Sequence, residues 1–88
     1  MTSVMKSATE IVPGDVWREK IRVEHVHSRT GRVGYLYETR PVRALKVEPG
    51  SVVSTLRITV EDTGTGAHTV VELFRENRRM VEEPATAA

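Results

Sequence analysis

The clearest alternation of apolar and polar residues lies in "SVVSTLRITVED", residues 51–62. Its first set of alternate positions holds Val52, Ser54, Leu56, Ile58 and Val60, and its second set holds Val53, Thr55, Arg57, Thr59 and Glu61. Because successive side chains of a β-strand point to opposite faces, this period of two predicts a half-buried strand. The "DTGTG" at 62–66 predicts a turn after the strand, since its two glycines can adopt positive φ.

A hairpin is predicted nearer the N-terminus. Pro13 and Gly14 interrupt the chain before "DVWREKIRVEHVHS", a run rich in β-branched residues. The strand face that we expect toward the core holds Trp17, Glu19, Ile21, Val23 and His25. A turn around Gly31 would join this strand to "VGYLYETR". Val26 breaks the alternation, so a bulge or the strand end is expected near His25.

The rest of the chain divides into one domain and two tails. Pro41 cannot donate to a strand ladder, which predicts an edge or a bend before a short strand "VRALKV" and a turn at "EPGS". Residues 1–10 and 84–88 have no periodic pattern and are expected to be flexible tails. The residues between them, 11–83, are expected to form a single β-rich domain, because 88 residues leave no room for a second core.

The segment "AHTVVELFRENRRMVEE", residues 67–83, allows two interpretations. As a helix over about 70–82, it would begin with a capping box formed by Thr69 and Glu72. One helix face would then carry Val70, Leu73, Phe74, Asn77 and Val81. As a strand, "HTVVELF" would pair antiparallel with residues 52–61 across the glycine turn. We favour the helix, with a short paired stretch before it.

Four to five antiparallel strands with one C-terminal helix predict an α+β or mainly β domain, arranged as a small antiparallel sheet or a small barrel. The motifs "PGDVW", "IRVEHV" and, after a glycine turn, "RVGYLY" follow one another within residues 12–60. In these motifs the chain resembles SH3-like small β-barrels and small uncharacterised proteins of actinobacteria and their phages. The resemblance implies a barrel and carries no particular activity.

Composition narrows the possible classes of function. The chain is 39% apolar and 28% charged, which is typical of a globular domain. The absence of cysteine excludes disulfides, thiolate zinc sites and cysteine nucleophiles. Neither a signal-peptide core nor an apolar run of about 18 residues occurs, so we expect a soluble cytoplasmic protein without membrane contact. Ten arginines against three lysines suggest a GC-rich genome, such as that of an actinobacterium or its phage.

Charge is distributed unevenly along the chain, although the net charge is only +1. Residues 15–46 hold eight basic and four acidic side chains, whereas residues 47–88 hold four basic and seven acidic ones. The candidate phosphate contacts of the basic half are Lys20, Arg29, Arg32, Arg40 and Arg43. A nucleic-acid surface would require these side chains to converge in space.

Two tyrosines stand in the middle of this basic half. Tyr35 and Tyr37 would share one strand face about 6.6 Å apart, a separation at which two splayed bases can stack on adjacent rings. Alternatively, both tyrosines belong to the core with only their hydroxyls in water. Because Trp17 and Phe74 are the only other large aromatic residues, we favour the core position for the tyrosines.

The histidines suggest a metal site only weakly. His25 and His27 have the i, i+2 spacing of a two-histidine edge, and His68 could supply a third ligand. No carboxylate at a suitable interval accompanies them, so we expect surface histidines and no bound metal.

The C-terminal arginines are a candidate partner-binding group. Arg75, Arg78 and Arg79 would lie close together on the expected helix, where they could contact a partner or pair locally with neighbouring glutamates. The chain contains no recognisable nucleophile, phosphate-loop or paired-carboxylate motif, so we expect neither an enzyme nor a cofactor.

We therefore expect a non-enzymatic binding module, an accessory or regulatory protein that binds DNA or RNA through its basic hairpin. The alternative is a protein-interaction or structural protein, such as a phage or mobile-element assembly or host-interaction factor, or an obligate homodimer that pairs exposed strand edges. The nearly neutral net charge and the small number of core aromatic residues favour this alternative.

Overall fold

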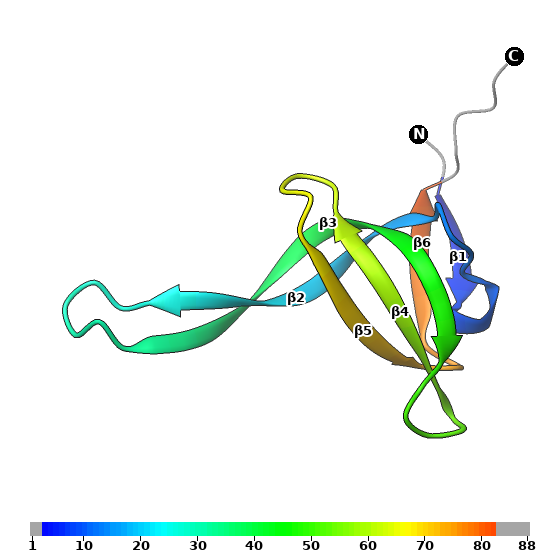
Figure 1. Cartoon of the computed structure of the whole chain (residues 1–88). Coiled ribbons are helices and arrows are strands. Elements are labelled where there is room, and N and C mark those ends of the chain that lie inside the picture. Colours follow the sequence, from blue (N-terminus) through cyan, green and yellow to red (C-terminus); the bar gives the residue numbers. More distant parts are fainter. Residues whose placement is uncertain (1–2, 83–88) are drawn as a thin grey trace, which may run out of the picture.

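The computed structural model describes residues 3–82, and most of them belong to one antiparallel sheet (Figure 1). Its six strands are β1 (Ser3–Ser7), β2 (Val16–Val26), β3 (Val33–Pro49), β4 (Thr55–Asp62), β5 (His68–Phe74) and β6 (Arg78–Glu82). They are arranged in the order β1-β6-β2-β3-β4-β5, and a short 3₁₀ turn, η1 (Ala8–Glu10), follows β1. The expectation of a mainly β, antiparallel fold is therefore confirmed, whereas the expected four to five strands are six.

The sheet curls into a half-barrel whose concave side holds the core (Figure 1). The buried apolar side chains come from η1, the segment that follows it and five of the strands: Ala8, Ile11, Trp17, Val42, Ala44, Leu56, Ile58, Val60, Leu73 and Val81. Trp17 is the largest of them. The expected alternation is confirmed over Leu56, Ile58 and Val60, which lie on one face of β4.

Strands β2 and β3 extend together far beyond this body and form a projecting hairpin (Figure 1). Strand β2 pairs with β6 only at Val16, and β3 pairs with β4 only from Val42 onward. Beyond these points the two strands pair only with each other, in continuous register to Val26↔Val33. We call residues 20–39 the arm. A strand end near His25 is confirmed, because β2 ends at Val26 without a bulge.

Strand β3 belongs to both the arm and the body, so the two strands expected on either side of Pro41 are one strand of 17 residues. Its register with β4 shifts between Ala44 and Lys46, which is a bulge that bends the strand. Pro41 lies just where pairing with β4 ends, and its carbonyl accepts hydrogen bonds from the Thr63 amide and hydroxyl. At that position the missing N–H of proline interrupts no ladder.

The expected helix over 70–82 is wrong, because this segment forms β5, a turn and β6. Strand β5 pairs with β4 across the glycine turn, from Glu61↔His68 to Thr55↔Phe74, which is the strand alternative that the sequence allows. The expected cap does not form. Glu72 instead accepts hydrogen bonds from the Ser51 amide and hydroxyl, both at 2.9 Å. Pairing with β4 buries Leu73 and decides for the strand, against the helix that the local pattern favours.

The N-terminal segment also differs from the expected tail over residues 1–10. Residues 3–7 form β1, which pairs with β6 from Ser3↔Glu82 to Ser7↔Arg78. Ala8 and Ile11 then enter the core, where each is at most 3% exposed. A strand of five residues is too short to show an alternation of apolar and polar side chains, and its register is defined only by its partner strand. The second expected tail, 84–88, lies outside the described residues.

Candidate interaction arm

The arm has two faces, which the register of β2 and β3 defines. Residues directly opposite each other in an antiparallel pair share a face. One face, called here the tyrosine face, carries Lys20, Arg22, Glu24 and Val26 from β2 and Val33, Tyr35, Tyr37 and Thr39 from β3. The opposite face carries Ile21, Val23 and His25 from β2 and Gly34, Leu36 and Glu38 from β3, and it continues into the core at Trp17 and Val42.

The tyrosines are not core residues, which corrects the expectation from the sequence. The exposed fraction is 59% for Tyr35 and 68% for Tyr37. Both belong to the part of β3 that pairs only with β2, and Tyr37 lies beside a hollow that residues of β5 also line. The core is instead closed by Trp17 and by aliphatic residues such as Ile58, and the scarcity of aromatic residues does not force the tyrosines inward.

A cation–π contact joins the two strands of the tyrosine face. The guanidinium carbon of Arg22 lies 4.5 Å from the ring centroid of Tyr35. Arg22 stands directly opposite Tyr37 and therefore diagonally opposite Tyr35. Such contacts contribute about 0.5–1 kcal/mol when exposed and hold both planar groups in place. Arg22 is absent from the site residues expected from the sequence, although its alternation with Lys20 along β2 could have identified it.

The end of the arm carries two arginines in a tight turn. The His27 amide donates to the Arg32 carbonyl, and the Gly31 amide donates to the His27 carbonyl. Gly31 has a φ of 66°, a conformation that glycine adopts without strain, so the turn expected there is confirmed. Arg29 and Arg32 are exposed, and neither forms an ion pair within residues 3–82.

The other two candidate arginines lie at the base of the arm and are paired with carboxylates. Arg40 contacts Glu38, with Nε–Oε2 at 2.9 Å, and Asp62, with Nη1–Oδ2 at 3.7 Å. Arg43 contacts Glu61 at 3.3 Å. Arg40 is on the face that continues into the core, whereas Arg43 is on the other. The four arginines therefore do not converge on one surface.

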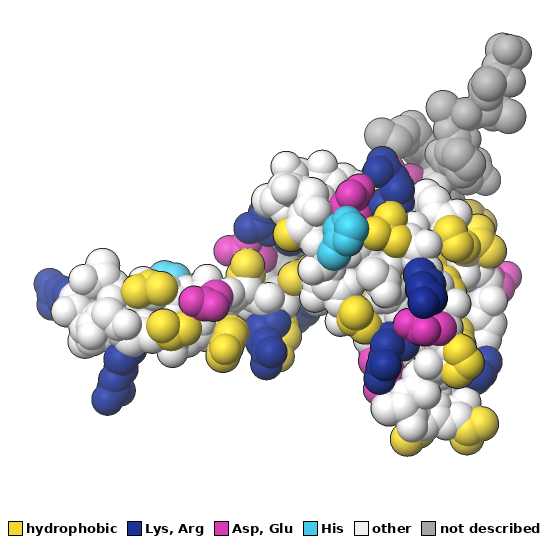
Figure 2. Space-filling view, viewed as in Figure 1, with side chains coloured by type: hydrophobic (Ala, Val, Ile, Leu, Met, Phe, Trp, Pro, Cys, Tyr) yellow, Lys and Arg dark blue, Asp and Glu magenta, His cyan; other side chains and the backbone are white. Residues whose placement is uncertain are grey.

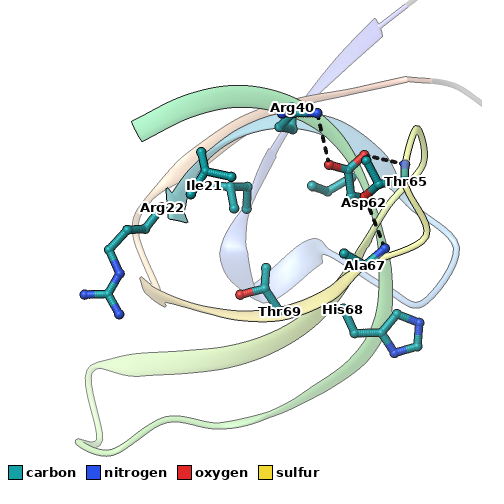
Figure 3. A pocket seen from close by; sticks show the side chains of 10 residues that line it. Ile21, Arg22, Arg40, Asp62, Thr65, Ala67, His68 and Thr69 are labelled. Atoms are coloured by element: carbon teal, nitrogen blue, oxygen red, sulfur yellow. Dashed lines mark hydrogen bonds and ion pairs between the residues drawn. The ribbon is translucent and has the colours of Figure 1, made fainter. Parts of the chain in front are cut away.

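A pocket of about 240 Å³ lies where the arm joins the body (Figure 3). Arg40 points toward Asp62 across it, whereas Arg22 extends away from it. The amides of Gly64 and Thr65 donate to Asp62 Oδ1. Chiefly through the Gly64 amide, these contacts and Arg40 lower the pKa of Asp62 below its ordinary value. Arg40 and Asp62 are thus already used to hold the β4–β5 turn against β3.

The C-terminal arginines are separated because their segment is not a helix. Arg75 lies in the β5–β6 turn and donates to the Val53 carbonyl at 2.8 Å. Arg79 turns inward and binds the buried carboxylate of Glu19, with Nε–Oε1 at 2.8 Å. Arg78 is exposed on β6. These three side chains therefore form no common surface.

The histidines do not come together either. His25 and His27 lie on the arm, whereas His68 lies on β5 within 3.4 Å of Glu61. Within residues 3–82, no group of three or more histidine, cysteine or acidic side chains is arranged to hold a metal ion. The same residues include no helix with the length and apolar character needed to cross a membrane.

Exposed apolar side chains lie on both the body and the arm. Figure 2 shows apolar and basic side chains exposed next to one another along the arm. Its exposed large apolar residues are Val26, Val33, Tyr35, Leu36 and Tyr37. Comparisons with known protein families, with curated proteins and with solved structures yield no match. The arm, with its basic, aromatic and aliphatic side chains, is the feature of this chain that points to a function.

Proposed function

We propose that this protein is a non-enzymatic binding module that contacts nucleic acid through its arm, on a small barrel of the SH3-like kind. The observation that supports the proposal best is the exposure of basic and tyrosine side chains on a hairpin that leaves the body. The arm holds four basic side chains, Lys20, Arg22, Arg29 and Arg32, and two acidic ones, Glu24 and Glu38. Glu38 is neutralised by Arg40, so the field around the arm is positive.

The arm also has the geometry that contact with a polyanion requires. Arg29 and Arg32, in the turn at the end of the arm, form no ion pair within the described residues. Binding of phosphate would therefore break no existing ion pair. Each phosphate that is neutralised releases counterions, which favours binding at low salt. The paired arginines of the base, Arg40 and Arg43, serve the fold and are not among the proposed phosphate contacts.

Titration of fluorescein-labelled random-sequence DNA and RNA tests the proposal. We expect binding at micromolar protein in low salt. The logarithm of the affinity should fall linearly with the logarithm of the salt concentration. The double variant Arg29→Ala/Arg32→Ala should reduce that slope by about 0.7–0.9 for each phosphate that the variant no longer neutralises.

The matched control removes the same charge from the body. Lys46 and Arg57 are exposed on the part of the sheet where β3 pairs with β4, beyond the arm. Lys46→Ala/Arg57→Ala should leave the salt slope unchanged if the arm binds the phosphates. Equal reductions in both double variants would show a diffuse charge effect, and no binding of either nucleic acid at low salt would refute the proposal.

The exposed aliphatic residues of the arm favour a second candidate, a protein partner or a homodimer. Hairpins of two strands are marginally stable alone, and burial of Leu36 and Val23, which lie opposite each other on one face, against a second chain would stabilise the arm. Leu36→Asp should then abolish any concentration-dependent increase in mass during sedimentation. Val53→Asp, at a 90% exposed position in the β3–β4 turn, is the control. A monomeric mass at all concentrations excludes the homodimer.

A further inference from the structure

We infer that the tyrosine face binds single-stranded nucleic acid, with bases stacked along β3 and phosphates held along β2. This inference rests on the proposed function, which it narrows to one class of ligand. Tyr37 supplies an open stacking ring, and Tyr35 holds the Arg22 guanidinium as a second stacking plane. Arg18, Lys20 and Arg22 supply the charges, Arg18 lying on the same face just below the arm.

Two parallel rows of side chains carry the inference. Arg18, Lys20 and Arg22 occupy alternate positions of β2, and Tyr35 and Tyr37 occupy alternate positions of β3 on the same face. Directly opposite residues of an antiparallel pair have Cβ atoms about 4.5–5.5 Å apart. A single strand laid along the arm could therefore place phosphates beside one row and bases beside the other.

The spacing within each row favours an unstacked strand. Alternate residues of a strand are about 6.6 Å apart. Successive phosphates of duplex DNA advance only about 3.4 Å along the axis of each strand. The rings therefore match bases that have been splayed apart, which single-stranded segments allow and a duplex does not. In a duplex the flat faces of the bases are stacked on each other and cannot reach Tyr35 or Tyr37.

Arg22 prepares the surface for stacking. Its guanidinium already lies over the Tyr35 ring at 4.5 Å, so that a planar cation covers one ring. Bases stack on guanidinium planes as well as on aromatic rings. Tyr37, directly opposite Arg22, is the most exposed aromatic side chain of the arm at 68%. The tyrosine face therefore presents two flat surfaces to neighbouring bases: the guanidinium of Arg22 and the open ring of Tyr37.

The charge of this face suits a polyanion. Arg18, Lys20 and Arg22 form no ion pair within residues 3–82. Glu24 is the one acidic residue of the tyrosine face, and it lies toward the end of the arm, opposite Tyr35. The positive charge therefore increases from Glu24 toward the body, where the phosphates would lie.

The test compares a labelled twelve-residue oligothymidine with a mixed-sequence duplex of the same length by fluorescence anisotropy. We expect tighter binding of the single strand. Tyr35→Leu and Tyr37→Leu should each weaken it about five- to 150-fold, which is the range for loss of one stacked base. Binding of the duplex should change less than two-fold. Leu36→Thr, between the tyrosines but on the opposite face, should have little effect on either ligand.

Two further variants separate stacking from folding. Tyr35→Phe and Tyr37→Phe keep the ring and should bind the single strand as the unaltered protein does. Trp17, which lies in the core, reports by its fluorescence whether the body of each variant is folded. If the phenylalanine variants bind the single strand as weakly as the leucine variants, stacking on the tyrosine rings is contradicted.

The outcomes distinguish this inference from the proposed function. Binding of neither ligand overturns both. Equal binding of the duplex and the single strand, with no effect of the leucine variants, overturns the stacking surface alone and leaves a charged arm that binds duplexes. A weakening limited to the single strand in the leucine variants supports both.

Discussion

At the scale of single residues, Glu19 illustrates how a charged side chain becomes part of the interior. The sequence places it on the core face of its strand, and its side chain is only 10% exposed. Its Oε1 accepts hydrogen bonds from Trp17 Nε1 at 3.0 Å and from Arg79 Nε at 2.8 Å. A buried carboxylate is tolerated because it is paired in this way. The contact with Arg79 also joins β2 to β6, across 60 residues of sequence.

Removal of Glu19 tests this role. We expect Glu19→Ala to lower the free energy of unfolding by about 2–3 kcal/mol, because the Trp17 N–H and the Arg79 guanidinium lose their partner. Denaturant titration followed by Trp17 fluorescence measures the change. Glu24→Ala, on the exposed part of the same strand, should stay within about 0.5 kcal/mol. Equal effects of the two substitutions would contradict a structural role of the buried carboxylate.

Glu72 provides a prediction about pH. Hydrogen bonds from the Ser51 amide and hydroxyl, with a smaller contribution from Arg57, lower the pKa of Glu72 below its ordinary value of 4.5. The ionised form is thus favoured in the folded state, so its stabilising effect is full above pH 4.5 and is lost as the pH falls through the lowered pKa. The difference in unfolding midpoint between the unaltered protein and Glu72→Gln should shrink toward zero as the pH falls from 4.5 through the lowered pKa of Glu72. A difference independent of pH would refute the linkage.

At the scale of elements, the turn between β3 and β4 depends on a position that a side chain cannot enter. A Cβ on Gly50 would collide with Thr55 Oγ1 and would lie 2.9 Å from the Thr55 carbonyl carbon. The Gly50 amide donates to the Thr55 carbonyl at 3.0 Å, which keeps the two residues close together. The sequence predicts a turn here from its Pro-Gly pair, but the close approach depends on the folded chain.

Alanine substitutions at two glycines separate the effect of this close contact from the general effect of replacing a flexible glycine. Gly50→Ala should destabilise the fold by about 1–3 kcal/mol through overpacking. Gly34→Ala should be neutral or slightly stabilising, because a Cβ at Gly34 meets no atom within 4 Å and alanine is less flexible in a strand. Thermal unfolding of both variants measures the difference. Similar midpoints would show that Thr55 moves aside at little cost.

At the same scale, β5 and β6 show where local patterns fail. The segment that contains Thr69 and Glu72 satisfies a helix cap and a helical period, which favours a helix, but it also permits a strand. Local periodicity cannot decide between them, because the deciding contact is the pairing of β5 with β4. The strand alternation over Leu56, Ile58 and Val60 is predicted correctly, since a half-buried strand records its burial in its own sequence.

At the scale of the whole molecule, the protein consists of a packed body and an unpacked arm. Every residue of the core lies outside residues 20–39, and within the arm only Ile21, Val23 and Gly34 are even partly covered. The principal extents of 51 × 36 × 17 Å reflect this elongated shape (Figure 1). A two-stranded hairpin without a third strand has little stability of its own. The arm should therefore open while the body stays folded.

Hydrogen exchange tests this difference. The amides of Val23 and Leu36 in the arm should exchange at least about 100-fold faster than those of Ile58 and Val60 in β4, because local opening of the arm exposes no core. Addition of oligothymidine should slow exchange in the arm selectively. If the arm amides exchange as slowly as the β4 amides in dilute protein, the division into body and arm is contradicted. Such a result would indicate that a second chain covers the arm.

The sequence by itself determined most of the features that each short segment encodes. These are the strand expected at 51–62, of which the structure confirms Thr55–Asp62 while residues 51–54 form a turn, the hairpin with its turn at Gly31, the glycine turn after Asp62 and the basic character of residues 15–46. The tertiary structure alone decided that 68–82 is two strands, that residues 3–7 belong to the sheet, and that the tyrosines are exposed on the arm. The physical reason is the range of the interactions. Turns and alternation depend on neighbouring residues, whereas pairing and burial depend on strands that are distant in sequence.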